Sequence, residues 1–238
     1  MAAPNDEPAL TVCTPAAGPT RAVAVVLHGG REHSHAPVRA HQLAVLRMRP
    51  FAGTLRRAGG RCGLAVARLR YLVRGWNADE RSPVHDLAWA LGRLAERFPD
   101  APIGLVGHSM GGRAAVYAAG HPSVRSVVAL APWLEPDDEY GQLAGRRLLV
   151  VHGDRDRRTD ARHSAAFARE AAAVAASAGY VSVRGDRHAM MGRAGLWHAL
   201  AAGFLLATLC GEPPHATVEP VAAKIVARVL AGETPVVV

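Results

Sequence analysis

The sequence predicts an α/β fold in which a mostly parallel central sheet is covered by helices on both faces. Short apolar runs alternate with longer amphipathic segments along the chain. Several of these runs contain only Val, Leu, Ile and Ala, which is typical of strands that are buried on both faces. Half of the residues are hydrophobic, which is enough for one large core. Since no repeat or linker divides the chain, a single domain over residues 1–238 is expected, with residues 1–8 as a flexible tail.

The expected strands are the apolar runs that end at turn residues. They cover residues 22–27, 63–70, 102–106, 124–130, 147–151 and 180–184, with a weaker strand over 9–13 at one edge of the sheet.

The expected helices have apolar residues at helical spacing and proline or glycine at their ends. They cover residues 50–58, 84–98, 110–119, 159–177, 195–209 and 218–230, and residues 40–49 are expected to be partly helical. The longest apolar stretch, residues 199–210, is shorter than the roughly 20 residues that a membrane span needs. It therefore predicts a buried helix, and no membrane span is expected.

Charge and cysteine content restrict the partners and the compartment. The net charge is +8, but Lys224 is the only lysine and the arginines are scattered rather than clustered in a run, so nucleic-acid binding is not expected. Three cysteines, Cys13, Cys62 and Cys210, form no C-x-x-C pair and favour a reducing compartment over a disulfide framework. The first ten residues have neither a basic leader nor an apolar segment, so no signal peptide is expected and a cytoplasmic location is predicted.

Residues 103–112, Ile-Gly-Leu-Val-Gly-His-Ser-Met-Gly-Gly, carry the strongest functional signal. A predicted buried strand runs into G-x-S-x-G, and a predicted helix follows at once. Such a tight turn lifts Ser109 above the end of the sheet, and it requires glycine at 107 and 111 because backbone approaches both positions. The start of the helix also favours a developing negative charge. Ser109 is therefore predicted to be a nucleophile.

This motif, together with Leu27-His28-Gly29-Gly30 after an earlier strand, resembles the α/β-hydrolase superfamily, especially its small esterases and dienelactone hydrolases. The resemblance extends from about residue 22 to residue 193. It implies an α/β-hydrolase fold and a serine hydrolase that needs no cofactor. Residues 131–146 are too few for the helical cap that many relatives insert there, so a capless enzyme is expected.

A serine nucleophile needs a histidine base that is oriented by a carboxylate, and in this superfamily the acid and then the base follow the serine. His152-Gly153-Asp154-Arg155-Asp156 resembles the family signature H-G-x-x-D, which assigns the acid to Asp156 and leaves Asp154 as the alternative. His188 follows the next predicted strand and is assigned as the base. A loop histidine that caps the next helix is the alternative interpretation of His188, and His163 and His198 lie at less suitable positions.

The resemblance also implies an oxyanion hole made of two backbone N–H groups. Met110, which follows the nucleophile, is expected to give one, and Gly30 the other, with Arg31 as the alternative to Gly30. Arg31, Trp76 and Trp133 are expected to contact substrate because they follow the carboxyl ends of strands, where open α/β sheets bind ligands. Plain packing is the alternative role for the two tryptophans.

Two further groups of residues invite a functional interpretation. His28, His33 and His35 resemble zinc ligands, but no carboxylate or cysteine cluster completes a site, and no metal is predicted. The three arginines around the presumed acid are interpreted as a solvated face, with steering of an anionic substrate as the alternative; they are Arg155, Arg157 and Arg158.

The expected function is hydrolysis of carboxylic esters of small or medium size through an acyl-enzyme on Ser109. The expected partner is a small-molecule acyl substrate, and the oligomeric state is not predicted. Thioester hydrolysis or acyl transfer on the same three residues is the close alternative. A binding module without catalysis is an alternative from a different class.

Overall fold

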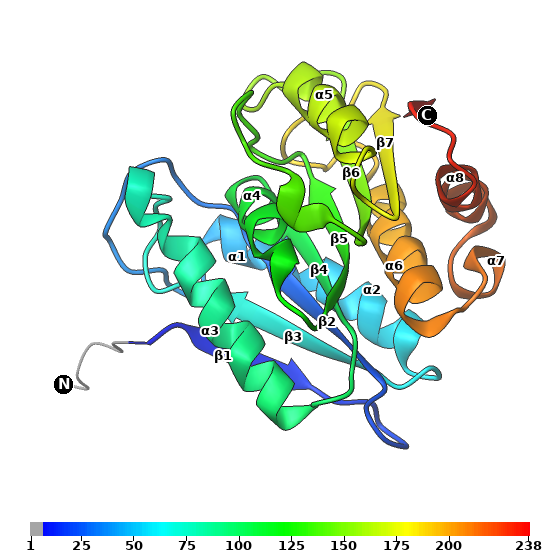
Figure 1. Ribbon diagram of the computed structural model, residues 1–238, viewed down its shortest axis with the longest axis horizontal. Coiled ribbons are helices and arrows are strands. Elements are labelled where there is room, and N and C mark those ends of the chain that lie inside the picture. The colour runs from blue at the N-terminus through cyan, green and yellow to red at the C-terminus, as the bar shows by residue number, and fades with distance from the viewer. Residues whose placement is uncertain (1–6) are drawn as a thin grey trace.

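The computed structural model describes residues 7–238 and contains one sheet with the strand order β1-β3-β2-β4-β5-β6-β7-β8 (Figure 1). The strand β1 is antiparallel to β3, and all other neighbours in the sheet are parallel. The strands are β1 Ala9–Cys13, β2 Ala22–Leu27, β3 Leu64–Arg70, β4 Ile103–His108, β5 Val124–Leu130, β6 Arg147–Gly153, β7 Ser177–Val183 and β8 Val236–Val237. The predicted α/β class and the mostly parallel sheet are confirmed.

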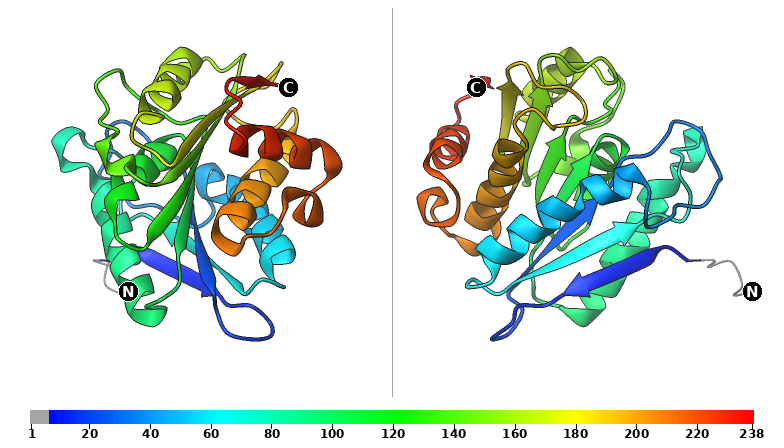
Figure 2. Two further views of the ribbon diagram at one scale, coloured as in Figure 1. Left: turned by 45° about the vertical axis from the view of Figure 1, so that its right-hand side comes forward. Right: turned by 180° about the vertical axis from the view of Figure 1, so that it is seen from behind.

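Helices cover the two faces of the sheet. Figure 2 shows α2, α6 and α8 on one side of the sheet and α3, α4 and α5 on the other. The helices are α1 Leu43–Arg47, α2 Arg49–Gly59, α3 Ser82–Arg97, α4 Met110–Tyr117, α5 Ala161–Ala171, α6 Ala194–Cys210, α7 Pro214–Thr217 and α8 Pro220–Leu230. Short 3-10 helices lie at Ala78–Glu80, Ala118–Gly120 and Gly141–Leu143, and the last is the one helical element between β5 and β6 in the part described.

The strand β2 shows why the sequence needs both helix layers. All six of its side chains are buried, and they alternate between two hydrophobic clusters. Ala24 and Val26 pack with Phe51 of α2 on one face, whereas Val25 and Leu27 belong to the cluster on the opposite face. Successive side chains of a strand point to opposite faces, so a strand that is apolar throughout must be covered twice.

The predicted helix over 159–177 is wrong at its carboxyl end. The helix α5 ends at Ala171, and β7 begins at Ser177, which pairs with Arg147 of β6. The alanine-rich segment between them favours a helix by intrinsic propensity, but propensity is a weak preference that sheet pairing can override. Ala176 accordingly donates its amide to the carbonyl of Arg146. The strand predicted over 180–184 therefore starts three residues earlier, and β8 was not predicted.

Other expectations concern the ends and the most apolar segment. Residues 1–6 of the predicted tail lie outside the described residues, and residues 7–8 precede β1 without regular structure. The apolar stretch 199–210 lies in α6, most of which is buried in the core. Within residues 7–238 no helix combines the length and the apolar character needed to cross a bilayer.

Candidate active site

Ser109 occupies a sharp turn between β4 and α4. Its backbone has φ 56° and ψ −119°, a conformation that a residue with a side chain rarely adopts. Such strain costs about 1–3 kcal/mol and persists only where the surroundings fix it. Here Ser109 donates its amide to Leu130 (3.0 Å) and accepts the amide of Trp133 at its carbonyl (3.2 Å). The last residue of β5 and the loop that follows therefore hold the turn in place.

Two glycines make this turn possible. A Cβ atom on Gly107 would overlap the carbonyl of Gly111, and a Cβ atom on Gly111 would lie 2.5 Å from the carbonyl oxygen of His28. Both positions must therefore lack a side chain, as the motif predicts.

The side chains of Asp156 and His188 meet above the carboxyl ends of β6 and β7. Nδ1 of His188 donates to Oδ2 of Asp156 at 2.8 Å. The loop after β6 carries the aspartate and the loop after β7 carries the histidine, so parallel pairing of the two strands brings both loops to one edge. This contact fixes the proton on Nδ1 and leaves Nε2 as the basic nitrogen.

Asp156 has a complete set of hydrogen-bond donors. Besides His188, its Oδ2 accepts from Nε2 of His152 (3.1 Å) and from the hydroxyl of Thr159 (2.9 Å). Its Oδ1 accepts the backbone amides of Arg158 (2.7 Å) and Thr159 (3.2 Å). Burial alone would raise the pKa of Asp156, but the donors from His152, His188 and Arg158 outweigh burial and hold the pKa far below its usual range. The carboxylate therefore stays ionised.

Ser109 and His188 lie next to each other without a direct hydrogen bond. The imidazole of His188 packs against that of His108, the residue before the serine, with ring centroids 4.7 Å apart. Among residues 7–238, neither the Ser109 hydroxyl nor Nε2 of His188 has a hydrogen-bond partner, and both line one cavity of about 300 Å³. Catalytic hydrogen bonds are often long before substrate binds and tighten in the complex. The two groups are thus free to act on a molecule between them.

The cavity also contains backbone positions expected to stabilise an oxyanion. Gly30 and Met110 line it, and neither amide donates to another group in the described chain. The amide of Arg31 instead donates to the carbonyl of Arg74 (2.8 Å). This bond leaves Gly30, rather than Arg31, with a free N–H beside that of Met110.

The three residues expected to contact substrate divide into two groups. Arg31 and Trp133 line the cavity, whereas Trp76 does not and is 4% exposed. The Trp76 ring packs against Trp133 and against the guanidinium of Arg113, which forms a buried ion pair with Asp138 (2.6 Å). The indole of Trp76 therefore has a packing role, and its predicted substrate contact stays a prediction.

The alternative acid and bases lie elsewhere. Asp154 accepts the amide of Gly185 (2.6 Å) and makes no contact with His188. His163 sits on α5 near Asp160, and the ring of His198 packs against Phe51.

The histidines that resemble zinc ligands do not converge. His28 is buried, and its two ring nitrogens bond the carbonyl of Gly29 and the amide of Tyr71. His33 and His35 lie at the surface, each beside a glutamate. In the described part of the chain, no three His, Cys, Asp or Glu side chains are arranged so that they could hold a metal ion.

Sequence reasoning missed His152 and Thr159 as parts of the site. His152 is fully buried, and its Nδ1 accepts from the hydroxyl of Ser164 (2.9 Å) while Nε2 donates to Asp156. The H-G-x-x-D signature points to the acid and by itself assigns no role to its histidine. Its position four residues before Asp156 is the signal that would have suggested a contact.

Comparisons with known proteins agree with this architecture. The sequence model of the alpha/beta hydrolase fold family matches residues 63–182. An alpha-beta serine hydrolase homologue from Coxiella burnetii is 18% identical, covers 81% of this chain and 89% of its own, and has a TM-score of 0.60. Est1E from Butyrivibrio proteoclasticus, solved with ferulic acid bound, is 16% identical over 84% of this chain and 95% of its own, with a TM-score of 0.61. The esterase Pf2001 from Pyrococcus furiosus is 14% identical over 80% and 82%, with a TM-score of 0.60.

At these identities the solved structures show a shared fold and no more, and a search of curated proteins gave no match. The family match covers slightly more than half of the 238 residues. Together with the sheet order and the strand–serine–helix turn, it shows that this chain belongs to the alpha/beta hydrolase fold family.

Proposed function

We propose that this protein is a serine hydrolase that cleaves carboxylic esters of small or medium-sized substrates. One observation carries the proposal: the ionised Asp156, whose side chain is inaccessible to solvent, holds His188 in one tautomer, and the free nitrogen of that imidazole shares a cavity with the strained Ser109. A serine hydroxyl is a weak nucleophile at neutral pH, and a base oriented by a carboxylate is the usual means of activating it.

The reaction has two halves. Nε2 of His188 takes the proton of Ser109 as the oxygen attacks the ester carbonyl, and the amides of Gly30 and Met110 donate to the oxyanion. Collapse of this intermediate gives an acyl-serine and an alcohol, which takes its proton from His188. Water, deprotonated by the same imidazole, then attacks the acyl-serine and releases the acid. Asp156 stabilises the imidazolium in both halves, and neither half requires a cofactor.

Trp133 and Arg31 are proposed to contact the substrate, since both line the cavity beside the serine. Est1E, a protein of the same fold, binds ferulic acid, which is consistent with an acid or its ester as the ligand class. Hydrolysis in a cytoplasmic setting is part of the proposal and rests on the sequence alone.

The test is hydrolysis of p-nitrophenyl esters from acetate to octanoate by the wild-type chain and by Ser109→Ala. Ser123→Ala is the matched control, because Ser123 precedes β5 at the opposite edge of the sheet. We expect Ser109→Ala to lower kcat by about 10⁴-fold or more and Ser123→Ala to change it less than about two-fold. A fluorophosphonate probe should label the wild-type chain and not Ser109→Ala.

Two results would contradict the proposal in different ways. A folded wild-type chain that neither hydrolyses the esters nor reacts with the probe would indicate a binding module. Hydrolysis of acyl thioesters far in excess of the matched oxygen esters would indicate a thioesterase built on the same residues.

A further inference from the structure

A second cavity, of about 550 Å³, adjoins the serine cavity and is lined mainly by arginines. The two cavities share His188 and Arg158, so a ligand can reach from one into the other. Three separate segments supply the arginines: α1, the loop that carries Asp156, and the residue before His188. They are Arg47, Arg155, Arg157, Arg158 and Arg187.

In the part of the chain that the structure describes, these five side chains have no carboxylate partner, unlike some arginines elsewhere in the molecule. Arg113, Arg162 and Arg228 each pair with a carboxylate. None of the five does so within residues 7–238, none donates a side-chain hydrogen bond there, and no carboxylate lines the cavity. The cavity therefore concentrates positive charge that no ion pair of the described chain neutralises, although Asp154 and Asp156 line an adjoining pocket with Arg155, Arg157 and Arg187.

Arg47 shows that this charge is costly in the absence of an anion. Its side chain is only partly exposed, at the end of α1. Burial first, and then the positive charge of Arg158, lower the pKa of Arg47. A fully solvated surface arginine has no such loss of stability of its charged form, because water and salt screen its charge. An anion placed between Arg47 and Arg158 would remove the repulsion and satisfy both guanidinium groups.

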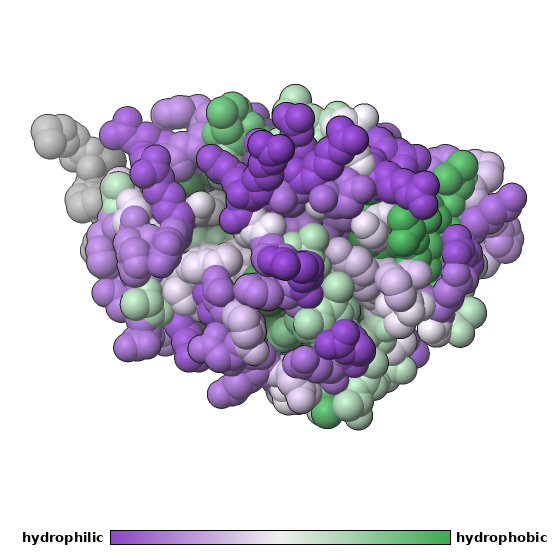
Figure 3. Space-filling model, turned by 90° about the horizontal axis from the view of Figure 1, so that it is seen from above, coloured by the Kyte–Doolittle hydropathy of each residue, from purple (hydrophilic) through white to green (hydrophobic). Residues whose placement is uncertain are grey.

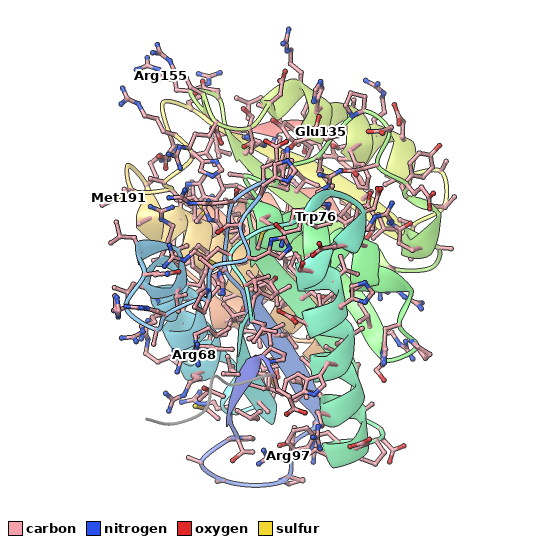
Figure 4. All side chains as sticks on the ribbon, turned by 90° about the vertical axis from the view of Figure 1, so that its left-hand side faces the viewer. Arg68, Trp76, Arg97, Glu135, Arg155 and Met191 are labelled. Carbon is pink, nitrogen blue, oxygen red and sulfur yellow. The ribbon has the colours of Figure 1, made fainter. Side chains whose placement is uncertain are left out.

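The surroundings agree with a polar binding face at this end of the molecule. Figure 3 views the end toward which β7 points in Figure 1, and hydrophilic side chains cover much of that face. Figure 4 shows Arg155 extending outward at this end, whereas Arg97 lies at the opposite end. The cavity also has an apolar border, because Leu43 of α1 lines it and is 77% exposed.

Guanidinium groups bind phosphate and carboxylate through paired N–H donors. Five of them around one cavity exceed what the single charge of a carboxylate can balance, whereas a phosphate monoester or a diphosphate carries at least about two negative charges at neutral pH. We propose that the arginine cavity binds a phosphate group carried by the acyl substrate, while the ester carbonyl of the same molecule lies at Ser109. This substrate class rests on the proposed ester hydrolysis, whereas phosphate binding itself does not.

The kinetic test compares two p-nitrophenyl esters that differ only in a terminal phosphate against a terminal hydroxyl on the acyl chain. We expect the wild-type chain to prefer the phosphorylated ester by about 10–100-fold in kcat/KM, since each bond from a charged donor is worth about tenfold. The preference should shrink as sodium chloride rises from about 50 mM to about 500 mM.

Charge-matched variants assign the preference to the cavity. Arg47→Gln and Arg158→Gln should each lower the ratio of the two kcat/KM values by about tenfold, and Arg47→Lys should lower it less. Arg97→Gln removes the same charge at the far end of the molecule and should leave the ratio unchanged. A ratio near one in the wild-type chain, or a ratio that the Arg47 and Arg97 variants change equally, would overturn the proposal.

A binding measurement separates this proposal from the proposed reaction. Titration calorimetry with inorganic diphosphate should give a saturable isotherm that Arg47→Gln weakens by about tenfold and Arg97→Gln does not. Binding of diphosphate by a chain that hydrolyses neither ester would refute the proposed function and keep the site. Hydrolysis of the uncharged ester without any diphosphate binding would refute the site and keep the function.

Discussion

Asp156→Asn tests the contact between Asp156 and His188. Each hydrogen-bond donor around the carboxylate restricts the orientation that the side-chain amide of the new asparagine can take. If the new NH₂ group occupied the Oδ1 position, it would face the backbone amides of Arg158 and Thr159. Those amides cannot become acceptors. Leaving the part-buried Thr159 amide unpaired costs up to about 1–3 kcal/mol, and the Arg158 amide, which belongs to an exposed residue, adds less.

The opposite orientation has a far smaller cost. At the Oδ2 position the NH₂ group faces His188, His152 and the hydroxyl of Thr159. An imidazole accepts as well as it donates once its tautomer changes, and the Thr159 hydroxyl can turn toward the carbonyl of Ala131, 3.4 Å away. We therefore expect this orientation, with a melting temperature close to that of the wild-type chain.

The same orientation removes the base. His188 would accept at Nδ1 and carry its proton on Nε2, so it could no longer take the proton of Ser109. The expected fall in kcat is about 10⁴-fold with little change in KM, the size of effect that a wrong histidine tautomer has in serine hydrolases of other folds.

The assay is steady-state hydrolysis of p-nitrophenyl acetate beside thermal unfolding, with Asp154→Asn as the control. Asp154 carries the same charge two residues away but contacts Gly185 instead of His188. We expect it to keep activity within about two-fold of the wild-type chain. If Asp156→Asn retains a tenth of the activity or more, or if Asp154→Asn loses as much, the assigned acid is wrong.

Four further substitutions probe the surroundings of the site. Replacing His152 with Phe keeps a ring but removes one hydrogen-bond partner from Ser164 and one from Asp156. Urea unfolding should show a free energy of unfolding that is lower by about 1–3 kcal/mol. In the ester assay kcat should fall while KM stays constant, and an effect on KM alone would contradict this reasoning. Trp76→Ala should lower the free energy of unfolding by about 3–5 kcal/mol with little change in KM, whereas Trp133→Ala should raise KM because Trp133 lines the cavity. Burial lowers the pKa of His28 to about 4 and that of His108 to about 3, whereas the ordinary pKa of histidine is 6.5. Below about pH 6.5 the unfolded chain therefore binds more protons than the folded chain. The free energy of unfolding should then fall by about 2 kcal/mol for each of the two histidines between about pH 7 and about pH 5. In denaturant titrations at these pH values, His108→Gln should remove about half of the total fall. A free energy of unfolding that does not change with pH would show that these rings are not buried and neutral.

The parts of the fold that the sequence predicted well are those where one physical signal dominates. The strands β2 and β5 were predicted with their observed bounds because both helix layers require continuous apolar runs there. The segment 159–177 failed because its alanines favour a helix locally, while pairing with β6 selects a strand from Ser177 onward. No local signal marks β8, whose two residues join the sheet only through β7.

The site shows the same division between local and distant information. The chain order of motifs pointed to Ser109, Asp156 and His188, and the structure brings the last two into contact and the first into a cavity shared with His188. The position of Trp76 after a strand end suggested substrate contact but gave no sign of its packing. The pairing of Arg113 with Asp138 beneath that ring depends on residues 25 positions apart, which no local pattern reveals.

The two pKa effects around the serine also determine what limits this protein in acid. Asp156 keeps its charge because its donors outweigh its burial, so protonation of the carboxylate does not disable the site at moderately low pH. His108 lies against His188, and its burial outweighs the two effects that favour its protonated form: the bond that Nε2 donates to the carbonyl of His188, and the negative charge of Asp156. Between about pH 6 and about pH 4 the ring therefore takes up its proton when the chain unfolds and not in the folded chain. Unfolding, rather than loss of the charge on Asp156, should therefore determine the pH below which the protein is irreversibly inactivated. His108→Gln should shift this pH downward, even where the activity of the variant at neutral pH is reduced.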